Sequence, residues 1–314
     1  MPASERLPPR RELNTARLLA EGELTVLGRI PDASNAVLYA SVGAEGRRIG
    51  CVYKPVAGER PLWDFPDGTL ARREAAAYEV CRALGWDLVP PTVLRDGPLG
   101  PGMCQEWVGA DPLEDPDEGP GTTSPTEPPG EPGAAEGGAD GPEVLVSLSP
   151  TGLVALLETG DPGPGWKAVG HASVPDESGG ERPALLAHAD DDRLRRTAVL
   201  DAVVNNADRK GGHLLALPDG ALRVIDHGVT FHTDDKLRTL LWGWAGEPLP
   251  EEATRALRRL TAGLAEGSPL ATRLAALLSA AELDALRKRA GALLAAGRHP
   301  LPGGDWPAIP WPPV

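Results

Sequence analysis

Cysteine and long apolar runs are both scarce in this sequence of 314 residues. The 3 cysteines, Cys51, Cys81 and Cys104, are scattered and form no C-x-x-C pair. This argues against a disulfide framework or a zinc site and favours reduced thiols in a cytosolic protein. No run reaches the ~18 apolar residues of a membrane span, and the first residues carry charges in place of a signal peptide's apolar core. We therefore expect a cytoplasmic protein with no membrane span.

Basic residues are outnumbered, with 31 Lys and Arg against 45 Asp and Glu and a net charge of −14. This balance argues against a nucleic-acid partner, and against an anionic membrane unless a local basic patch outweighs it. Much of the acidity falls in residues 109–143, which are rich in Pro, Gly and Thr and hold no Lys or Arg. Such a segment has too little apolar surface to offset the entropy of ordering, so the sequence predicts a disordered insertion.

Several common site motifs are also missing. There is no G-x-G-x-x-G loop, although a predicted strand over Leu24–Ile30, a turn at 31–35 and a strand over Ala36–Val42 offer small and hydroxyl residues. Ser34 and Asn35 in that turn are candidates for holding phosphate, while an ordinary hairpin is the alternative. The H-E-x-x-H and H-x-E…C-x-x-C spacings are absent as well, which argues against a metal hydrolase.

The most informative stretch runs from Val199 to Phe231. A polar cluster at 206–213 is followed by two short apolar strands, Leu214–Leu217 and Leu222–Ile225, joined by a Pro-Asp-Gly turn. A hairpin of this kind brings Asp208 and Asp226, which flank it, to the same open end. Kinases use two carboxylates in this way, one to orient the attacking hydroxyl and one to hold Mg²⁺ on the nucleotide phosphates.

Roles follow for the residues around the hairpin. Asp208 is the candidate catalytic residue, and Asp226 and His213, five positions after Asp208, are the candidate metal ligands. Lys210 is placed to meet the γ-phosphate. Asp201 is expected to be buried and to anchor the loop by accepting backbone N–H groups.

The N-terminal part supplies a candidate ion pair. Lys54 closes a predicted strand over Arg48–Lys54, in the manner of the kinase lysine that pairs nucleotide phosphates. A predicted helix then runs to Leu84, stops at Gly85 and carries two glutamates, Glu74 and Glu79. The two face differently, so only one can point at the lysine, and we choose Glu74.

A hinge is predicted next, after strands over Val89–Val93 and Met103–Val108. Glu106, Trp107 and Val108 are the candidate adenine contacts, chiefly through their backbone groups. Trp107 is equally well placed to be a core residue.

The remaining elements are predicted from periodicity and caps. We expect helices over Leu153–Glu158, Asp190–Asn206 (with Asp190 as N-cap), Glu251–Leu264, Leu270–Leu278 and Ser279–Ala296, strands over Trp166–Ser173 and Ala184–His188, and a Pro-rich strap over Trp306–Val314.

These residues carry a resemblance to a known family. Asn206-x-Asp208-Arg209-Lys210, followed by Asp226-His227-Gly228, resembles the catalytic and metal loops of phosphatidylinositol 3/4-kinase-like proteins and, more distantly, of HipA-type kinases. The segments Arg73–Tyr78 and Val89–Thr92 resemble their helix and following strand. More closely, the whole chain is similar to an actinobacterial family described by that kinase likeness alone, over Leu24–Val108 and Val144–Trp244.

The resemblance implies an ion pair between Lys54 and Glu74, a catalytic Asp208 and a metal-binding Asp226. The chain departs from the pattern at His213, where the kinases keep Asn, and at His227, where Phe is usual. Imidazole can bind a divalent ion, but Mg²⁺ prefers oxygen.

Together these observations predict an α+β, two-lobed, protein-kinase-like fold. Residues 1–108 would form a β-rich N-lobe with phosphate loop and hinge, and residues 144–314 a mainly helical C-lobe with catalytic and metal loops. The expected activity is ATP-dependent transfer of the γ-phosphoryl group, with Mg²⁺ or Mn²⁺, to a hydroxyl of a soluble metabolite or protein. The alternatives are a nucleotide-binding pseudokinase with a regulatory role and an AMP transferase.

Overall fold

The computed structural model describes residues 10–30, 36–60, 62–65, 69–109, 144–158, 160–175, 180–303 and 307–313. The proposed phosphate-binding residues Ser34 and Asn35 lie outside these ranges, as do Trp306 and all of the predicted insertion except Gly109. Within the described residues, no helix is both long enough and apolar enough to cross a membrane.

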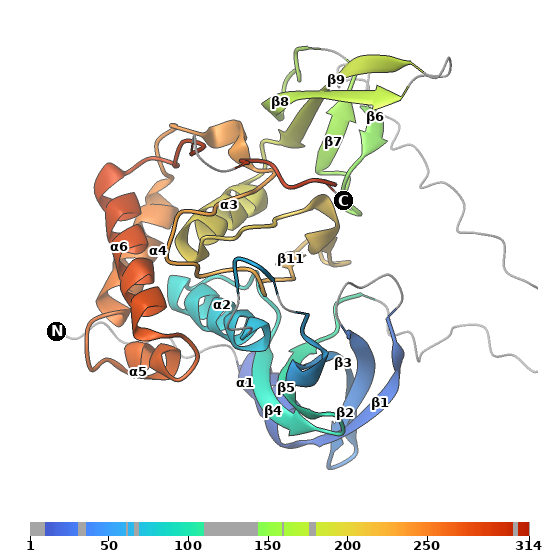
Figure 1. Cartoon of the computed structure of the whole chain (residues 1–314), viewed down its shortest axis with the longest axis vertical. Coiled ribbons are helices and arrows are strands. Elements are labelled where there is room, and N and C mark those ends of the chain that lie inside the picture. The colour runs from blue at the N-terminus through green and yellow to red at the C-terminus, as the bar shows by residue number, and fades with distance from the viewer. Residues whose placement is uncertain are drawn as a thin grey trace, which may run out of the picture.

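The N-lobe is built on a five-stranded antiparallel sheet in the order β1-β2-β3-β5-β4 (Figure 1). Its strands are β1 Glu23–Arg29, β2 Leu38–Ala44, β3 Arg47–Pro55, β4 Thr92–Gly97 and β5 Gly100–Glu106. The sheet buries one apolar cluster, which includes Leu19 of helix α1 (Arg10–Glu21), Val42 and Tyr53. The predicted strands of this lobe are confirmed, although β4 begins only at Thr92.

Helix α2 (Leu70–Leu84) links the two lobes. Its C-cap Gly85 has φ +74°, in the left-handed region that favours glycine, so the predicted stop is confirmed. Most of its residues are buried, and Ala76, Val80 and Leu84 belong to the large apolar core of the C-lobe. This helix is therefore fixed to the C-lobe by its packing.

A second antiparallel sheet begins the C-lobe, in the order β6-β7-β9-β8. Its strands are β6 Val144–Ser147, β7 Val154–Leu157, β8 Trp166–Pro175 and β9 Glu181–Ala189. The predicted helix over Leu153–Glu158 is wrong, because β7 pairs along its whole length with β9. A short apolar run suits a buried strand as well as a helix, and here the neighbouring strand decides the outcome.

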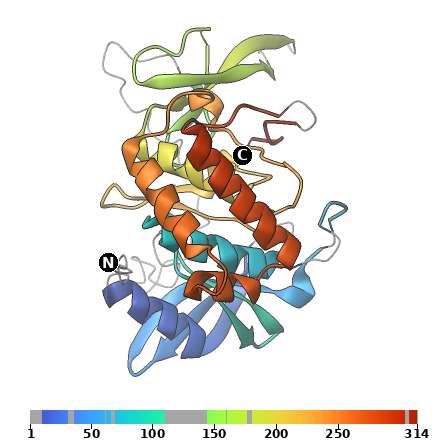
Figure 2. The same ribbon diagram turned by 90° about the vertical axis from the view of Figure 1, so that its left-hand side faces the viewer.

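Four helices complete the C-lobe: α3 Asp192–Val204, α4 Glu251–Gly263, α5 Pro269–Ala275 and α6 Ala280–Ala296. Figure 2 shows α4 and α6 side by side across one face. The predicted capping box of Ser279 and Glu282 is confirmed at the start of α6. The N-cap of α3 is Asp191 and not Asp190, whose carboxylate instead accepts the Trp244 indole N–H at 2.8 Å.

The predicted hairpin is formed by β10 (Leu214–Ala216) and β11 (Leu222–Val224), preceded by the 3₁₀ turn η2 (Gly211–His213). Two other short 3₁₀ turns are η1 (Val56–Gly58) and η3 (Trp242–Trp244). The C-terminal residues 307–313 run alongside this region. There the Ala308 carbonyl accepts the Thr239 N–H at 3.0 Å and the Pro313 carbonyl accepts the Gly211 N–H at 2.9 Å.

Candidate active site

Lys54, at the end of β3, lies between two carboxylates. Its Nζ is 2.7 Å from Glu74 Oε1 on α2 and 3.1 Å from Asp226 Oδ1 after β11. Burial alone would lower the lysine pKa, but Asp226 and Glu74 outweigh that effect and the pKa is raised. The same contact holds the pKa of Asp226 well below its usual range. Lys54 and Asp226 are therefore both charged at neutral pH.

The choice between the two glutamates of α2 is settled by their partners. Glu74 is 1% exposed and contacts Lys54, whereas Glu79 pairs with Arg273 of α5 at 2.8 Å and with Arg82 at 3.7 Å. Because Glu74 is buried among apolar neighbours, it depends on hydrogen bonds to both of its oxygens. Lys54 supplies one, and the backbone N–H of His227 supplies the other at 2.9 Å.

Asp226 has φ +62°, a left-handed conformation that is uncommon for a residue with a side chain. Such backbone costs about 1 kcal/mol or more and persists only where surrounding contacts hold it. Here the contacts are the His227 N–H on Glu74 and the Asp226 carboxylate on Lys54. The turn thus aims the carboxylate into the space between the lobes.

Behind this turn lies a fully buried polar cluster, which we call the brace: Asp201, Asn206, Arg209 and His227. Arg209 pairs with Asp201 at 2.9 Å, and both side chains are 0% exposed. Arg209 also donates to the Ile225 carbonyl at 2.8 Å and to His227 Nε2 at 2.7 Å. Since a guanidinium can only donate, His227 Nε2 accepts, and the proton of the neutral ring is on Nδ1.

The brace connects the two loops that carry the candidate aspartates. Asp201 was expected to accept backbone N–H groups, but its carboxylate accepts side-chain N–H groups instead, from Arg209 and, at 3.0 Å, from Asn206. The Asn206 oxygen in turn accepts the Asp208 N–H at 3.0 Å. Arg209 therefore lies buried behind the candidate aspartates.

Asp208 itself is less constrained. Its carboxylate is 35% exposed, and the nearest cation in the described residues is Lys210, with Nζ 3.8 Å away. Burial, followed by the repulsion of Asp226, raises the pKa of Asp208 in spite of Lys210. A carboxylate with a raised pKa and few partners is suited to accept a proton or to orient a hydroxyl.

His213 faces Asp226, with its Nε2 3.4 Å from Asp226 Oδ2. Its Nδ1 accepts the Lys210 backbone N–H at 3.4 Å. Burial lowers the pKa of His213 to about 4, so the ring is neutral at physiological pH. Because Nδ1 accepts, the ring proton is on Nε2, and Nε2 offers a lone pair only in the other tautomer, with the proton on Nδ1. The contact with Asp226 places both predicted metal ligands on the same side of the cleft.

Gly211 shows how tightly the polar cluster is enclosed. A Cβ atom at this position would lie 1.6 Å from the Leu148 carbonyl oxygen, so only glycine fits. The loop between β6 and β7 therefore passes directly over the segment that holds Lys210 and His213.

The described residues fit a divalent cation of one particular kind. Among them, no three His, Cys, Asp or Glu side chains gather to enclose a metal ion. Asp226 and the neutral His213 offer two adjacent donors, which suits an ion that takes its other ligands from phosphate oxygens and water. An ion held by protein ligands alone does not fit this site.

Two of the three predicted hinge residues already use their backbone N–H groups in hydrogen bonds within the N-lobe. The Glu106 N–H donates to the Pro91 carbonyl at 2.9 Å, and the Trp107 N–H donates to the Gly50 carbonyl at 3.0 Å. The Trp107 ring packs edge-on against Tyr39 at 5.0 Å. Among the described residues, the Val108 N–H has no such partner, so it is the best placed of the three to bind a base.

Comparisons with known proteins bear on the fold and the family. No protein-family model matches the chain. The protein Rv2133c of Mycobacterium tuberculosis (strain ATCC 25618 / H37Rv) is 48% identical over 304 residues, 94% of each chain.

Among solved structures, the Golgi casein kinase with Mn and ADP bound has a TM-score of 0.50 at 12% identity, covering 92% of this chain and 76% of that one. A further structure of the Golgi casein kinase has a TM-score of 0.48 at 11% identity, covering 92% and 75%. The first of these shows that the chain has the two-lobed, kinase-like fold. Because the sequence identity with Rv2133c extends over nearly the whole of both proteins, the chain belongs to the same family as Rv2133c of Mycobacterium tuberculosis.

Proposed function

We propose that the protein is an ATP-dependent phosphotransferase that moves the γ-phosphoryl group to a hydroxyl of a soluble small molecule or a protein. The observation that carries this proposal is the position of Lys54, within 2.7 Å of Glu74 and 3.1 Å of Asp226. A partly buried lysine held by a helix glutamate, beside a half-exposed carboxylate that can bind metal, is the arrangement that phosphoryl transfer needs. The likeness to a kinase structure with Mn and ADP bound supports it.

On the nucleotide side, Lys54 would bind phosphate oxygens while Glu74 fixes its direction. Asp226 and His213 would hold Mg²⁺ or Mn²⁺, which supplies charge neutralisation for the phosphates when bound. The adenine would lie against Glu106, Trp107 and Val108, and Ser34 and Asn35 would cover the phosphates. Because Lys54, Glu74 and Asp226 are already in contact, little reorganisation would be needed at the moment of reaction.

On the acceptor side, Asp208 would orient the hydroxyl and accept its proton. Its raised pKa brings it closer to the operating pH than an ordinary aspartate, which favours proton transfer. Lys210, 3.8 Å from Asp208, would reach the transferred phosphoryl group.

The phosphatidylinositol 3/4-kinase-like type is part of this proposal and rests on the motifs around Asp208 and Asp226. A cytoplasmic location is proposed as well, supported by three buried cysteines, none of which forms a disulfide. A nucleotide-binding pseudokinase is the second candidate, favoured by His213 at the position where the kinases keep Asn. AMP transfer, which releases pyrophosphate in place of ADP, is the third.

The test is to incubate the purified protein with ATP and either Mg²⁺ or Mn²⁺ and to quantify ADP, AMP and pyrophosphate. Nucleotide affinity is measured in parallel by calorimetry. We expect metal-dependent ATP binding and slow release of ADP. Lys54→Met should reduce ADP release on the order of 10²-fold.

Lys167→Met is the matched control, since Lys167 is also a partly buried lysine in an ion pair, 2.6 Å from Glu247, but it lies on β8. It should leave ADP release unchanged. Binding without turnover would favour the pseudokinase, and pyrophosphate release would favour the AMP transferase. Absence of ATP binding with both metals would overturn all three.

A further inference from the structure

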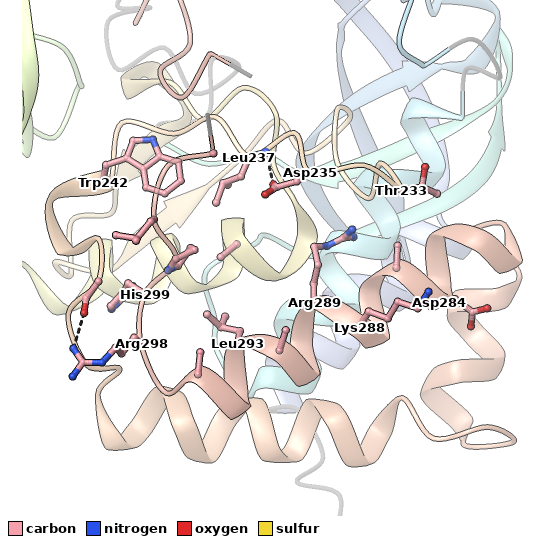
Figure 3. A pocket seen from close by; sticks show the side chains of 18 of the residues that line it. Thr233, Asp235, Leu237, Trp242, Asp284, Lys288, Arg289, Leu293, Arg298 and His299 are labelled. Carbon is pink, nitrogen blue, oxygen red and sulfur yellow. Dashed lines mark hydrogen bonds between the residues drawn. The ribbon is translucent and has the colours of Figure 1, made fainter. Parts of the chain in front are cut away.

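A second cavity lies in the C-lobe, between α6 and the segments 233–246 and 298–303 (Figure 3). Its volume is about 960 Å³, within the range of pockets that take small molecules. Its walls are largely apolar: Leu293 and several alanines from α6 face Leu237 and Trp242. None of the candidate active-site residues described above lines it.

One charged group in this wall is incompletely bonded. Arg289 of α6 donates through Nε to the Val203 carbonyl at 3.2 Å and through Nη1 to the His232 carbonyl at 2.9 Å. Its Nη2 is buried and has no hydrogen-bond partner among the described residues. No carboxylate among them lies within ion-pair distance of this guanidinium. A buried cationic donor without a partner is costly, which points to an anion that accepts from it.

The other charged groups in the wall leave a positive excess. Lys288 is exposed and has no ion-pair partner among the described residues. Asp284 pairs with Arg287 at 2.7 Å, whereas Asp235 accepts only the Leu237 N–H at 3.4 Å and offsets part of the charge of Arg289 from beyond ion-pair distance. Figure 3 shows Lys288 and Arg289 rising from the same stretch of α6.

The far end of the cavity adds no competing anion. Arg298 donates to the Gly246 carbonyl at 2.8 Å, and the Nε2 of His299 accepts from Arg195 at 3.3 Å. Burial lowers the pKa of His299 to about 4, so it is neutral at physiological pH. The charge in the wall is thus concentrated at Arg289 and Lys288, with apolar surface beyond them.

We propose that this cavity binds a small amphipathic anion, with an apolar body against Leu237, Trp242 and Leu293 and one carboxylate or phosphate group on Arg289 and Lys288. The apolar walls favour a hydrocarbon or aromatic body over a polar metabolite such as a free nucleotide. The anionic group would accept from the exposed Lys288 ammonium and, after a small movement of the Arg289 side chain that uncovers its buried Nη2, from that atom as well; both hydrogen bonds are charge-assisted. This proposal does not depend on the proposed phosphotransfer activity.

The test uses three probes of equal chain length: decanoate, decyl phosphate and decanol. Binding to the full-length protein is measured by calorimetry below their micelle-forming concentrations. We expect one or both anions to bind and decanol to bind about tenfold more weakly or worse, which is the scale of one hydrogen bond to a charged group. The preference between decanoate and decyl phosphate distinguishes a carboxylate ligand from a phosphate ligand.

Three variants locate the site. Lys288→Gln should weaken anion binding several-fold without affecting decanol, and Ala285→Trp, which fills the cavity, should weaken all three probes. Arg258→Gln, an exposed arginine on α4 that does not line the cavity, is the matched control and should change nothing. Arg289→Lys tests the anchoring group, with circular dichroism to confirm that the variant is folded. Equal binding of decanol and the anions, no binding of any probe, or binding unaffected by Lys288→Gln and Ala285→Trp would each overturn the proposal.

Discussion

The two aspartates at the open end of the β10–β11 hairpin lie in opposite electrostatic environments. Asp226 is contacted by Lys54 at 3.1 Å and by His213 at 3.4 Å, and its pKa is held well below the usual range. Among the described residues, the cation nearest to Asp208 is Lys210 at 3.8 Å, and burial raises the pKa of Asp208. The sequence places one of these residues on each side of the hairpin, and the difference comes from their tertiary contacts.

Such a divergence is how one site can assign different chemistry to two like groups. The residue with the lowered pKa stays anionic and suits a cation, whereas the residue with the raised pKa suits proton transfer. The supporting contacts differ too. The turn at Asp226 is held by the His227 N–H, which donates to Glu74, and by Arg209, which donates to the Ile225 carbonyl. The predictions below test whether Asp226 and Asp208 differ in this way.

The largest effect is expected at Asp226. Asp226→Ala should abolish the metal dependence of ATP binding and reduce phosphoryl transfer on the order of 10³-fold, because it removes the charged metal ligand. Calorimetry with and without Mn²⁺, together with ADP release, measures both. Asp87→Ala, at an exposed aspartate paired with Arg223, is the control and should leave both unchanged. Metal-dependent binding that survives in Asp226→Ala would contradict the role of this residue.

The brace should dominate stability. Arg209→Met leaves the Asp201 carboxylate buried without its cation, which should lower the free energy of unfolding by about 3–5 kcal/mol. Arg223→Met is the matched control, because its partner Asp87 is mostly exposed and surface pairs contribute about 0–1 kcal/mol. Urea denaturation measures both. Equal, small losses in the two variants would show that the brace does not hold the turn at Asp226.

The sequence predicted the residues that meet at the site, Lys54, Glu74 and Asp226, but it did not predict the brace behind them. Lys54 and Asp226 stand where a strand and a hairpin end, and Glu74 lies in the second turn of a helix; these elements follow from local periodicity and turn residues. Their convergence in the structure needs only that the three elements pack as expected. The choice of Glu74 over Glu79 was a matter of helix phase, and the contacts of both residues agree with it.

The brace could not be read from the sequence, although its members lie close together in the chain, because their side-chain bonds depend on tertiary packing. Arg209 lies in a polar cluster, and its burial depends on how α3 meets the hairpin. His227 was noted only as a departure from Phe, although a ring nitrogen is what allows it to accept from Arg209. The strand β7 was mistaken for a helix for a similar reason, since its identity depends on β9.

At the other aspartate, Asp208→Asn should reduce phosphoryl transfer while leaving ATP binding largely intact. The amide keeps the shape of the side chain but cannot accept a proton as the carboxylate does. Phosphoryl transfer should therefore fall on the order of 10²-fold, while ATP affinity stays within a few-fold. Single-turnover rates and calorimetry give the two numbers. A loss of ATP binding as large as that in Asp226→Ala would mean that the two aspartates act together and the contrast is wrong.

The raised pKa of Asp208 predicts an acid limb in the rate profile. A carboxylate with a raised pKa becomes protonated at a higher pH than an ordinary aspartate, so activity should fall through an apparent pKa above 3.8 as the pH decreases. The residual activity of Asp208→Asn should lack this limb. Rates are taken at several pH values with circular dichroism as the check on folding. An identical limb in wild type and Asp208→Asn would assign it to another group.

The smallest effect is expected from His213, which refines the metal preference without creating the site. Its imidazole nitrogen is a softer donor than oxygen, so the pair of His213 and Asp226 should favour Mn²⁺ over Mg²⁺ relative to a pair of oxygen ligands. His213→Asn supplies an amide oxygen at the position where the kinases that the sequence motifs resemble keep Asn. The ratio of ATP affinities in Mg²⁺ and Mn²⁺ should shift several-fold toward Mg²⁺, with Asp226 still essential. His171→Asn, an exposed histidine on β8, is the matched control and should leave the ratio unchanged. If His213→Asn also leaves the ratio of ATP affinities unchanged, His213 does not bind the cation. Its role is then to position Asp226 through their 3.4 Å contact, and Asp226 is the metal ligand of the pair.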